Sequence, residues 1–124
     1  MSQMQVPEHF EMTLETHGDT AFVRLGGEFD MACEECFEAA LQQLVEQQSD
    51  TIVIDLSKLR FMDSSGISML LAAHQRSQRA GFRIGIVPGR GEVERVFELT
   101  GVDRVLPMLG DEEGSASAPV VNAA

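Results

Sequence analysis

Three short groups of residues in this chain carry side chains that could do chemistry. Residues 63–66 read Asp-Ser-Ser-Gly and bring a carboxylate and two hydroxyls together. Cys33 and Cys36 have the two-residue spacing of dithiol redox sites. Residues 85–91, Gly-Ile-Val-Pro-Gly-Arg-Gly, are rich in glycine, as phosphate-binding loops are. The candidate chemistries are therefore phosphate acceptance, thiol redox chemistry and nucleotide binding.

The Asp-Ser-Ser-Gly group fits two interpretations. Ser and Asp are preferred at helix N-termini because their side-chain oxygens accept hydrogen bonds from free backbone N–H groups. Alternatively, a serine at a helix start can accept a phosphate, which brings roughly −1.5 to −2 charges at neutral pH. The positive end of the helix dipole tolerates that charge, so the fold should survive. A partner that needs close, neutral contact with the loop would be rejected.

The cysteine pair and the glycine-rich stretch have simpler interpretations. Cys33 and Cys36 fall on the apolar stripe of a predicted helix, where a free cysteine behaves as a small hydrophobic residue. A small thiol oxidoreductase using this pair stays a remote alternative, and without a second ligand pair we expect no zinc site. Residues 85–91 lack the Lys-Ser/Thr end of a P-loop and the Gly-x-Gly-x-x-Gly spacing, which predicts a turn. We therefore expect no cofactor, no metal and no catalytic residue.

The hydropathy pattern predicts the elements that must position these groups. Apolar alternation over 10–15 and 21–25 indicates a β-hairpin, whose second strand ends at Gly26-Gly27. The segments that follow are a helix from about Met31, capped by Asp30 and closed by Ser49-Asp50, a strand over 51–56, a helix over 64–80, a strand over 82–87, a helix over 92–100 and a short edge strand at 105–106. This order predicts an α/β fold with a mixed sheet of four or five strands, an N-terminal hairpin, parallel core strands and about three helices.

Length and charge narrow the class of protein. The chain has 124 residues, enough for one domain over 10–109, with a flexible lead-in at 1–9 and a disordered acidic and Ser/Ala-rich tail at 110–124. A formal net charge of −11 argues against binding to nucleic acid or to an anionic membrane. No apolar run approaches the ~20 residues that cross a bilayer. We expect a soluble, cytoplasmic protein.

Two motifs in these positions resemble those of a known family. Residues 27–30, Gly-Glu-Phe-Asp, follow the hairpin, and residues 61–66, Phe-Met-Asp-Ser-Ser-Gly, follow the third strand. With the element order, over about residues 8–109, they resemble the STAS domain and, more narrowly, its stand-alone bacterial members, the anti-sigma factor antagonists. One departure is that Ile67 follows Gly66, where family members often have a second small residue.

The resemblance implies a phosphorylation switch. The second serine of the family motif is the phosphorylated one, which here is Ser65. The expected kinase is the partner itself, an anti-sigma factor with ATP-dependent serine kinase activity, and a PP2C-type phosphatase restores the serine. Unphosphorylated protein would bind the anti-sigma factor and free a sigma factor, which is transcription regulation in sporulation or the stress response. The alternative that keeps the fold is a STAS subunit of a stress-sensing complex or a lipid-transport system, without a phospho-switch.

The same resemblance implies a docking surface made of the loop and the exposed side of the second helix. Its expected residues are Asp30, Asp63, Ser64, Ser65, Gly66, Ser68 and Met69. Asp30 and Asp63 match acidic positions beside the phosphorylated serine, and Ser64 would mainly cap and shape the loop.

Overall fold

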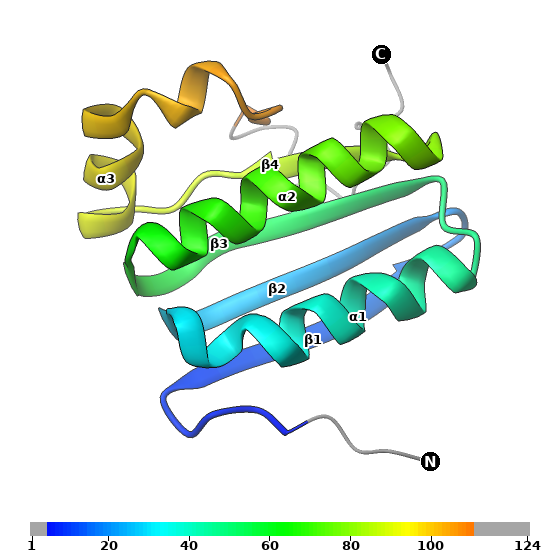
Figure 1. Cartoon of the computed structure of the whole chain (residues 1–124), viewed down its shortest axis with the longest axis horizontal. Helices are drawn as coiled ribbons and strands as arrows, with labels where there is room; N and C mark the ends of the chain where they lie inside the picture. The colour runs from blue at the N-terminus through cyan, green and yellow to red at the C-terminus, as the bar shows by residue number, and fades with distance from the viewer. Residues whose placement is uncertain (1–4, 111–124) are drawn as a thin grey trace.

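The computed structural model describes residues 5–110 as a four-stranded sheet with helices on one side (Figure 1). The elements in chain order are β1 (Phe10–His17), β2 (Thr20–Phe29), the 3-10 turn η1 (Met31–Cys33), α1 (Glu34–Glu46), β3 (Thr51–Met62), α2 (Ser64–Ala80), β4 (Arg83–Val87), α3 (Glu92–Thr100) and the 3-10 turn η2 (Val102–Arg104). The predicted α/β class is confirmed, and the bounds of the second and third predicted helices agree with α2 and α3.

The sheet is mixed, in the order β1-β2-β3-β4. β1 and β2 form the predicted antiparallel hairpin, and β2, β3 and β4 are parallel to one another. Helices connect the parallel strands, as a crossover between parallel strands requires. The α/β architecture with parallel central strands, predicted from the change of hydropathy period, is therefore confirmed.

The predicted edge strand at 105–106 is wrong. The chain coils into η2 after Gly101, and only Met108 forms a bridge to the edge, parallel to Ile86 in β4. Ile86 N donates to the Pro107 carbonyl at 3.0 Å, and Leu109 N donates to the Ile86 carbonyl at 2.8 Å. The N–H groups of Val105 and Leu106 both donate to the Val102 carbonyl, at 3.0 and 2.9 Å, so these two residues close the turn and do not pair with the sheet.

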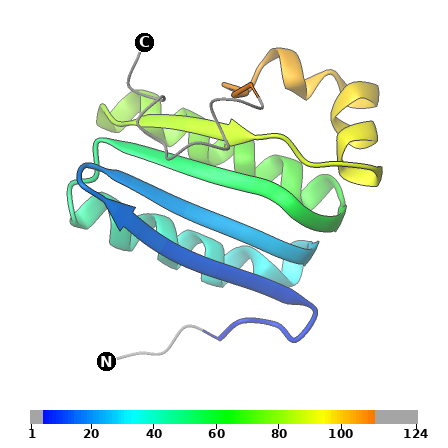
Figure 2. The same cartoon turned by 180° about the vertical axis from the view of Figure 1, so that it is seen from behind.

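The helices α1 and α2 cover one face of the sheet, and the opposite face carries no helix in the described chain (Figures 1 and 2). The main core lies between these helices and the strands, because alternate strand residues such as Val23 and Ile54 pack with Phe37 and Leu70. Within residues 5–110, no helix has both the length and the apolar character needed to cross a bilayer.

Two strands run further than the sequence predicted. Gly26-Gly27 lies inside β2, at register shifts against β3, and does not end the strand. Gly27 has φ +79°, and a Cβ there would lie 2.3 Å from the His9 carbonyl oxygen, so the glycine forms a bulge against the preceding chain. β3 likewise continues past residue 56 to Met62. The last pair of this longer register is Phe29 beside Met62.

Candidate functional site

The parallel pairing of β2 and β3 brings two aspartates to the same edge of the sheet. Asp30 follows Phe29 and Asp63 follows Met62, and these two preceding residues are register partners. The carboxyl ends of parallel strands are where α/β proteins place their sites. Both motifs that the sequence singled out, residues 27–30 and 61–66, therefore meet at one end of the molecule (Figure 1).

Asp63 caps α2, and the serines do not. Its backbone is extended (φ −105°, ψ −171°), and its Oδ1 accepts hydrogen bonds from Ser65 N at 2.9 Å and Gly66 N at 3.3 Å. Two of the orphan donors at the start of the helix are thereby satisfied. Ser64 is the first helical residue and is exposed, so the cap that the sequence assigned mainly to Ser64 belongs to Asp63.

Gly66 fixes how α2 sits on the strand ends. It is buried, and a Cβ there would lie 2.6 Å from Met62 Cγ and 2.9 Å from Phe29 Cδ2. Real Cβ atoms do not approach other atoms so closely, so only glycine lets the first turn of the helix pack against both strands. Gly66 therefore serves close internal packing, and this packing sets the position of the neighbouring Ser65 on the helix.

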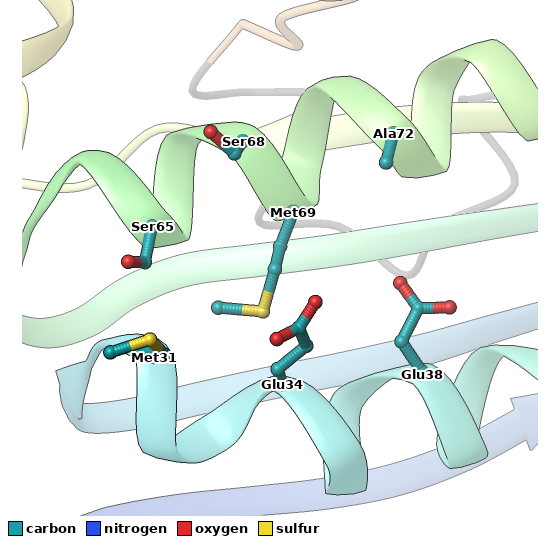
Figure 3. Close-up of a pocket in the computed structure, with 7 residues that line it drawn as sticks. All are labelled: Met31, Glu34, Glu38, Ser65, Ser68, Met69 and Ala72. Atoms are coloured by element: carbon teal, nitrogen blue, oxygen red, sulfur yellow. The ribbon is translucent and has the colours of Figure 1, made fainter.

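Ser65 lies in a groove between α2 and the η1–α1 segment (Figure 3). The residues that line this groove are Met31, Glu34, Glu38, Ser65, Ser68, Met69 and Ala72. Ser65 and Met69 extend from α2 toward α1, and Glu34 and Glu38 extend back toward α2. Ser65 is half-buried, so its hydroxyl is both positioned by its surroundings and open to solvent.

Met69 differs from the sequence-based expectation of an exposed position. It is only 5% exposed, because it stands four residues after Ser65 and therefore faces α1 across the groove. Ser68, by contrast, is exposed and points away from α1 (Figure 3). Of the predicted docking residues on α2, Ser65, Ser68 and Met69 all line the groove, but only Ser68 among them is fully on the surface.

The side of the groove formed by α1 was missed by the sequence analysis. Glu38 forms an ion pair with Arg76, 3.7 Å between Oε1 and Nη1, whereas Glu34 has no ion pair within the described chain. Met31 is 69% exposed, an unusual position for a large apolar residue. The usable signal was the spacing of Glu34 and Glu38, four residues apart and therefore on one line of the helix.

Asp30 is engaged away from the groove. Its Oδ1 accepts a hydrogen bond from Ala32 N at 3.1 Å, as a cap, and its Oδ2 lies 3.0 Å from His9 Nε2. The bond with His9 holds the pKa of Asp30 below its ordinary value, more than burial raises it. His9, which the sequence placed in a flexible lead-in, is therefore held by its contact with Asp30. Residues 1–4 of that lead-in lie outside the described residues, as does nearly all of the predicted tail.

The cysteines behave as the apolar-stripe interpretation predicted. Both are free thiols, with Cys33 0% and Cys36 3% exposed. Burial raises the pKa of Cys33 to about 11, and burial also raises the pKa of Cys36. Redox cysteines need a lowered pKa and access to solvent, so this pair has the opposite of both properties.

Comparison with known proteins gives the family. The family profile described as STAS domain matches residues 11–116. The chain is 28% identical to the anti-sigma-F factor antagonist RsfB of Mycobacterium tuberculosis over 101 residues, which cover 82% of this chain and 82% of RsfB.

Solved structures agree with this comparison. The crystal structure of an anti-sigma factor antagonist from Mycobacterium paratuberculosis has a TM-score of 0.75 and 27% identity, covering 95% of this chain and 96% of that one. The structure of the Bacillus cell fate determinant SpoIIAA in its phosphorylated form has a TM-score of 0.63 and 25% identity, covering 84% of this chain and 96% of that one. The chain thus spans nearly the whole length of these similar proteins.

Proposed function

Because the chain belongs to the STAS domain family, we propose that it is an anti-sigma factor antagonist that phosphorylation of Ser65 switches off. In its unphosphorylated form it binds an anti-sigma factor in the cytoplasm and releases a sigma factor. The partner is also the ATP-dependent serine kinase, and a PP2C-type phosphatase reverses the reaction. The chain itself is a binding module and a phosphoacceptor, with no catalytic role.

The observation that carries the proposal is the position of Ser65. Its hydroxyl is the one side-chain O–H among residues 63–66 that lines the groove, while Ser64 is exposed outside it. The names of the similar proteins support the class of function, and the phosphorylated form of the similar SpoIIAA supports the switch. The Asp63 cap accepts a hydrogen bond from the backbone N–H of Ser65 at 2.9 Å and so fixes the backbone from which the hydroxyl extends.

The switch follows from the charges around Ser65. A phosphate there carries roughly −1.5 to −2 charges and stands at the N-terminus of α2, which stabilises a negative charge by about 0.3–1 kcal/mol. The fold therefore keeps its stability. A partner docked over the groove has no such compensation, because burying an unpaired charge costs several kcal/mol. Glu34 and Glu38 across the groove add like charge and give the phosphate no cation to pair with.

The docking surface contains apolar anchors beside the switch. Met31 is 69% exposed in the groove, and Phe61 is 45% exposed just before the loop. Exposed large apolar residues beside a functional loop are typical of protein–protein contact sites. Because Glu34 lines the same groove without an ion pair in the described chain, the surface suits a partner segment that is apolar with a basic residue.

The test is phosphorylation by the partner. Untagged protein is incubated with ATP and lysate from its source cells, and intact mass is measured beside Ser65→Ala and the matched controls Ser64→Ala and Ser68→Ala. One added phosphate in all samples except Ser65→Ala supports the switch. No added phosphate, with the kinase shown to be active in that lysate, overturns it in favour of a STAS subunit of another assembly.

A further inference from the structure

Three potential metal ligands meet where β2 ends and η1 begins. They are His9, Asp30 and Cys33, and their ligand atoms all lie within 4.8 Å of one another. His9 Nε2 is 3.0 Å from Asp30 Oδ2 and 3.1 Å from Oδ1, and Cys33 Sγ is 3.6 Å from Asp30 Oδ1. We propose that this cluster, the His9–Asp30–Cys33 corner, binds a transition-metal ion of the zinc class. The proposal is independent of the switch at Ser65.

The three donors are the types that zinc takes in proteins, an imidazole nitrogen, a carboxylate oxygen and a thiolate sulfur. A tetrahedral zinc ion with ordinary bond lengths separates such ligand atoms by about 3.3–3.6 Å. The 3.6 Å between Cys33 Sγ and Asp30 Oδ1 agrees with this spacing, and the 3.1 Å between the same oxygen and His9 Nε2 needs only a small increase. On binding, the Cys33 thiol loses its proton to solvent, and water completes the coordination as in other sites with three protein ligands.

The backbone holds the ligands in place before any ion arrives. Glu28 N donates to the His9 carbonyl at 2.9 Å, and the bulge at Gly27 lets the two segments approach that closely. Ala32 N, in turn, donates to Asp30 at 3.1 Å. A binding site whose ligands are fixed by neighbouring contacts has less conformational entropy to lose on binding.

Two of the three ligands are partly open to solvent. The side chains of His9 and Asp30 are 36% and 28% exposed, whereas Cys33 is 0% exposed. An ion would enter past His9 and close the corner over the thiol. The sequence predicted no zinc site because it found no second ligand pair near Cys33 and Cys36. The fold supplies the missing ligands from His9 and Asp30, which stand 21 residues apart in the chain.

The test is a titration of untagged, reduced protein with Co²⁺ alone, which reports thiolate coordination by absorption, followed by competition with Zn²⁺. We expect one Co²⁺ per chain, a thiolate-to-cobalt charge-transfer band and the strong visible bands of tetrahedral cobalt. Cys33→Ser should abolish the charge-transfer band. His9→Gln, a change at a partly exposed position, should weaken binding by at least the roughly 10–100-fold that loss of an outer-sphere partner costs.

Two control variants keep the test specific to the corner. Cys36→Ser and His17→Gln remove a thiol and an imidazole outside the cluster and should leave the titration unchanged. Circular dichroism of each variant shows that the fold is intact. The proposal is overturned if wild type gives no charge-transfer band, if the band survives Cys33→Ser, or if His9→Gln binds as tightly as wild type. In each of these cases the corner is a hydrogen-bonded cluster only.

Discussion

The starts of η1 and α2 share the same local geometry, a capping aspartate, but differ in the residues that follow it. Asp30 and Asp63 both have extended backbone, and each accepts a hydrogen bond from the N–H two residues further on, at 3.1 Å and 2.9 Å. After Asp63 comes a half-buried serine that opens onto a groove. After Asp30 the chain buries Cys33, and the carboxylate itself is taken up by His9.

The difference shows that a capping aspartate does not by itself make a switch. The two motifs look alike in sequence as acidic residues at the ends of parallel strands. What distinguishes them is the reactive side chain two or three residues further on: Ser65 is half-buried and lines the groove, whereas Cys33 is buried in the core. A phosphate can be added at Ser65 without disturbing the core, whereas residues 31–33, Met-Ala-Cys, offer no hydroxyl to accept one.

The largest expected effect comes from placing a charge at the start of α2, where Ser65 lines the groove. Ser65→Asp should reduce affinity for the anti-sigma factor by about 100-fold, or roughly 2.7 kcal/mol, because the partner must bury a carboxylate in the groove. Ser64→Asp is the matched control and should bind nearly as wild type, since Ser64 is exposed outside the groove. Isothermal titration calorimetry measures both affinities. Equal losses in the two variants would mean that general charge, and not the groove, controls binding.

The next largest effect is on the segment that leads into η1, and it leaves the start of α2 unchanged. Gly27→Ala should lower the free energy of unfolding by about 2 kcal/mol or more, from a strained positive φ and a Cβ pressed on the His9 carbonyl. Gly81→Ala has a similar φ of +87° but nothing within 4 Å of the new Cβ, so only the strain of about 1–2 kcal/mol applies. Urea denaturation compares them. If Gly81→Ala costs as much as Gly27→Ala, the contact with His9 contributes nothing.

A smaller effect tests which residue caps α2. Asp63→Ala should cost about 1 kcal/mol of unfolding free energy, the usual value for a lost N-cap. Ser64→Ala should stay within about 0.5 kcal/mol of wild type, as exposed substitutions do. The same urea measurements report both. A larger loss from Ser64→Ala than from Asp63→Ala would return the cap to the serine, as the sequence first predicted.

The smallest effect is the pH dependence of the unfolding free energy that the Asp30–His9 contact contributes at the start of η1. It is measured with a chelator present. Asn can cap as Asp does, so Asp30→Asn removes mainly the ion pair with His9, worth less than about 1 kcal/mol. Because the His9 bond lowers the pKa of Asp30 in the folded state, its contribution is complete above the unfolded pKa of about 3.9 and fades as the pH falls through the folded value. Wild type and variant should therefore converge only as the pH falls below the lowered pKa of folded Asp30, which lies under the unfolded value of about 3.9. A constant difference down to pH 2 would contradict the ion pair.

Local patterns in the sequence predicted the elements well, because each depends on neighbours in the chain. The bounds of α2 follow from Asp63, the helical periodicity and Gly81, all within one segment. The strand ends were less predictable: Gly26-Gly27 has the composition of a turn, and only the pairing with β3 makes it a bulge. The predicted end of the hairpin was therefore wrong because it depends on pairing with β3, a segment distant in the sequence.

The sequence predicted the α2 side of the groove but not the α1 side. Ser65 and Asp63 are recognisable from their motif, but Glu34 and Glu38 enter the groove because α1 and α2 lie side by side on one face of the sheet (Figure 3). That arrangement follows from packing, which a single stretch of sequence does not encode. The contact between His9 and Asp30 is of the same kind, since it depends on the pairing of β1 with β2.

The most direct test of the account is the affinity of the unphosphorylated and the singly phosphorylated protein for the anti-sigma factor. Both forms are purified, the phosphate is located on Ser65 by fragmentation mass spectrometry, and binding is measured by calorimetry in the same buffer. The account predicts that the phosphorylated form folds with an unchanged melting temperature to within a few degrees and binds at least about 100-fold more weakly. Equal affinity of the two forms would contradict it, because the groove would then accept the charge that is proposed to close it.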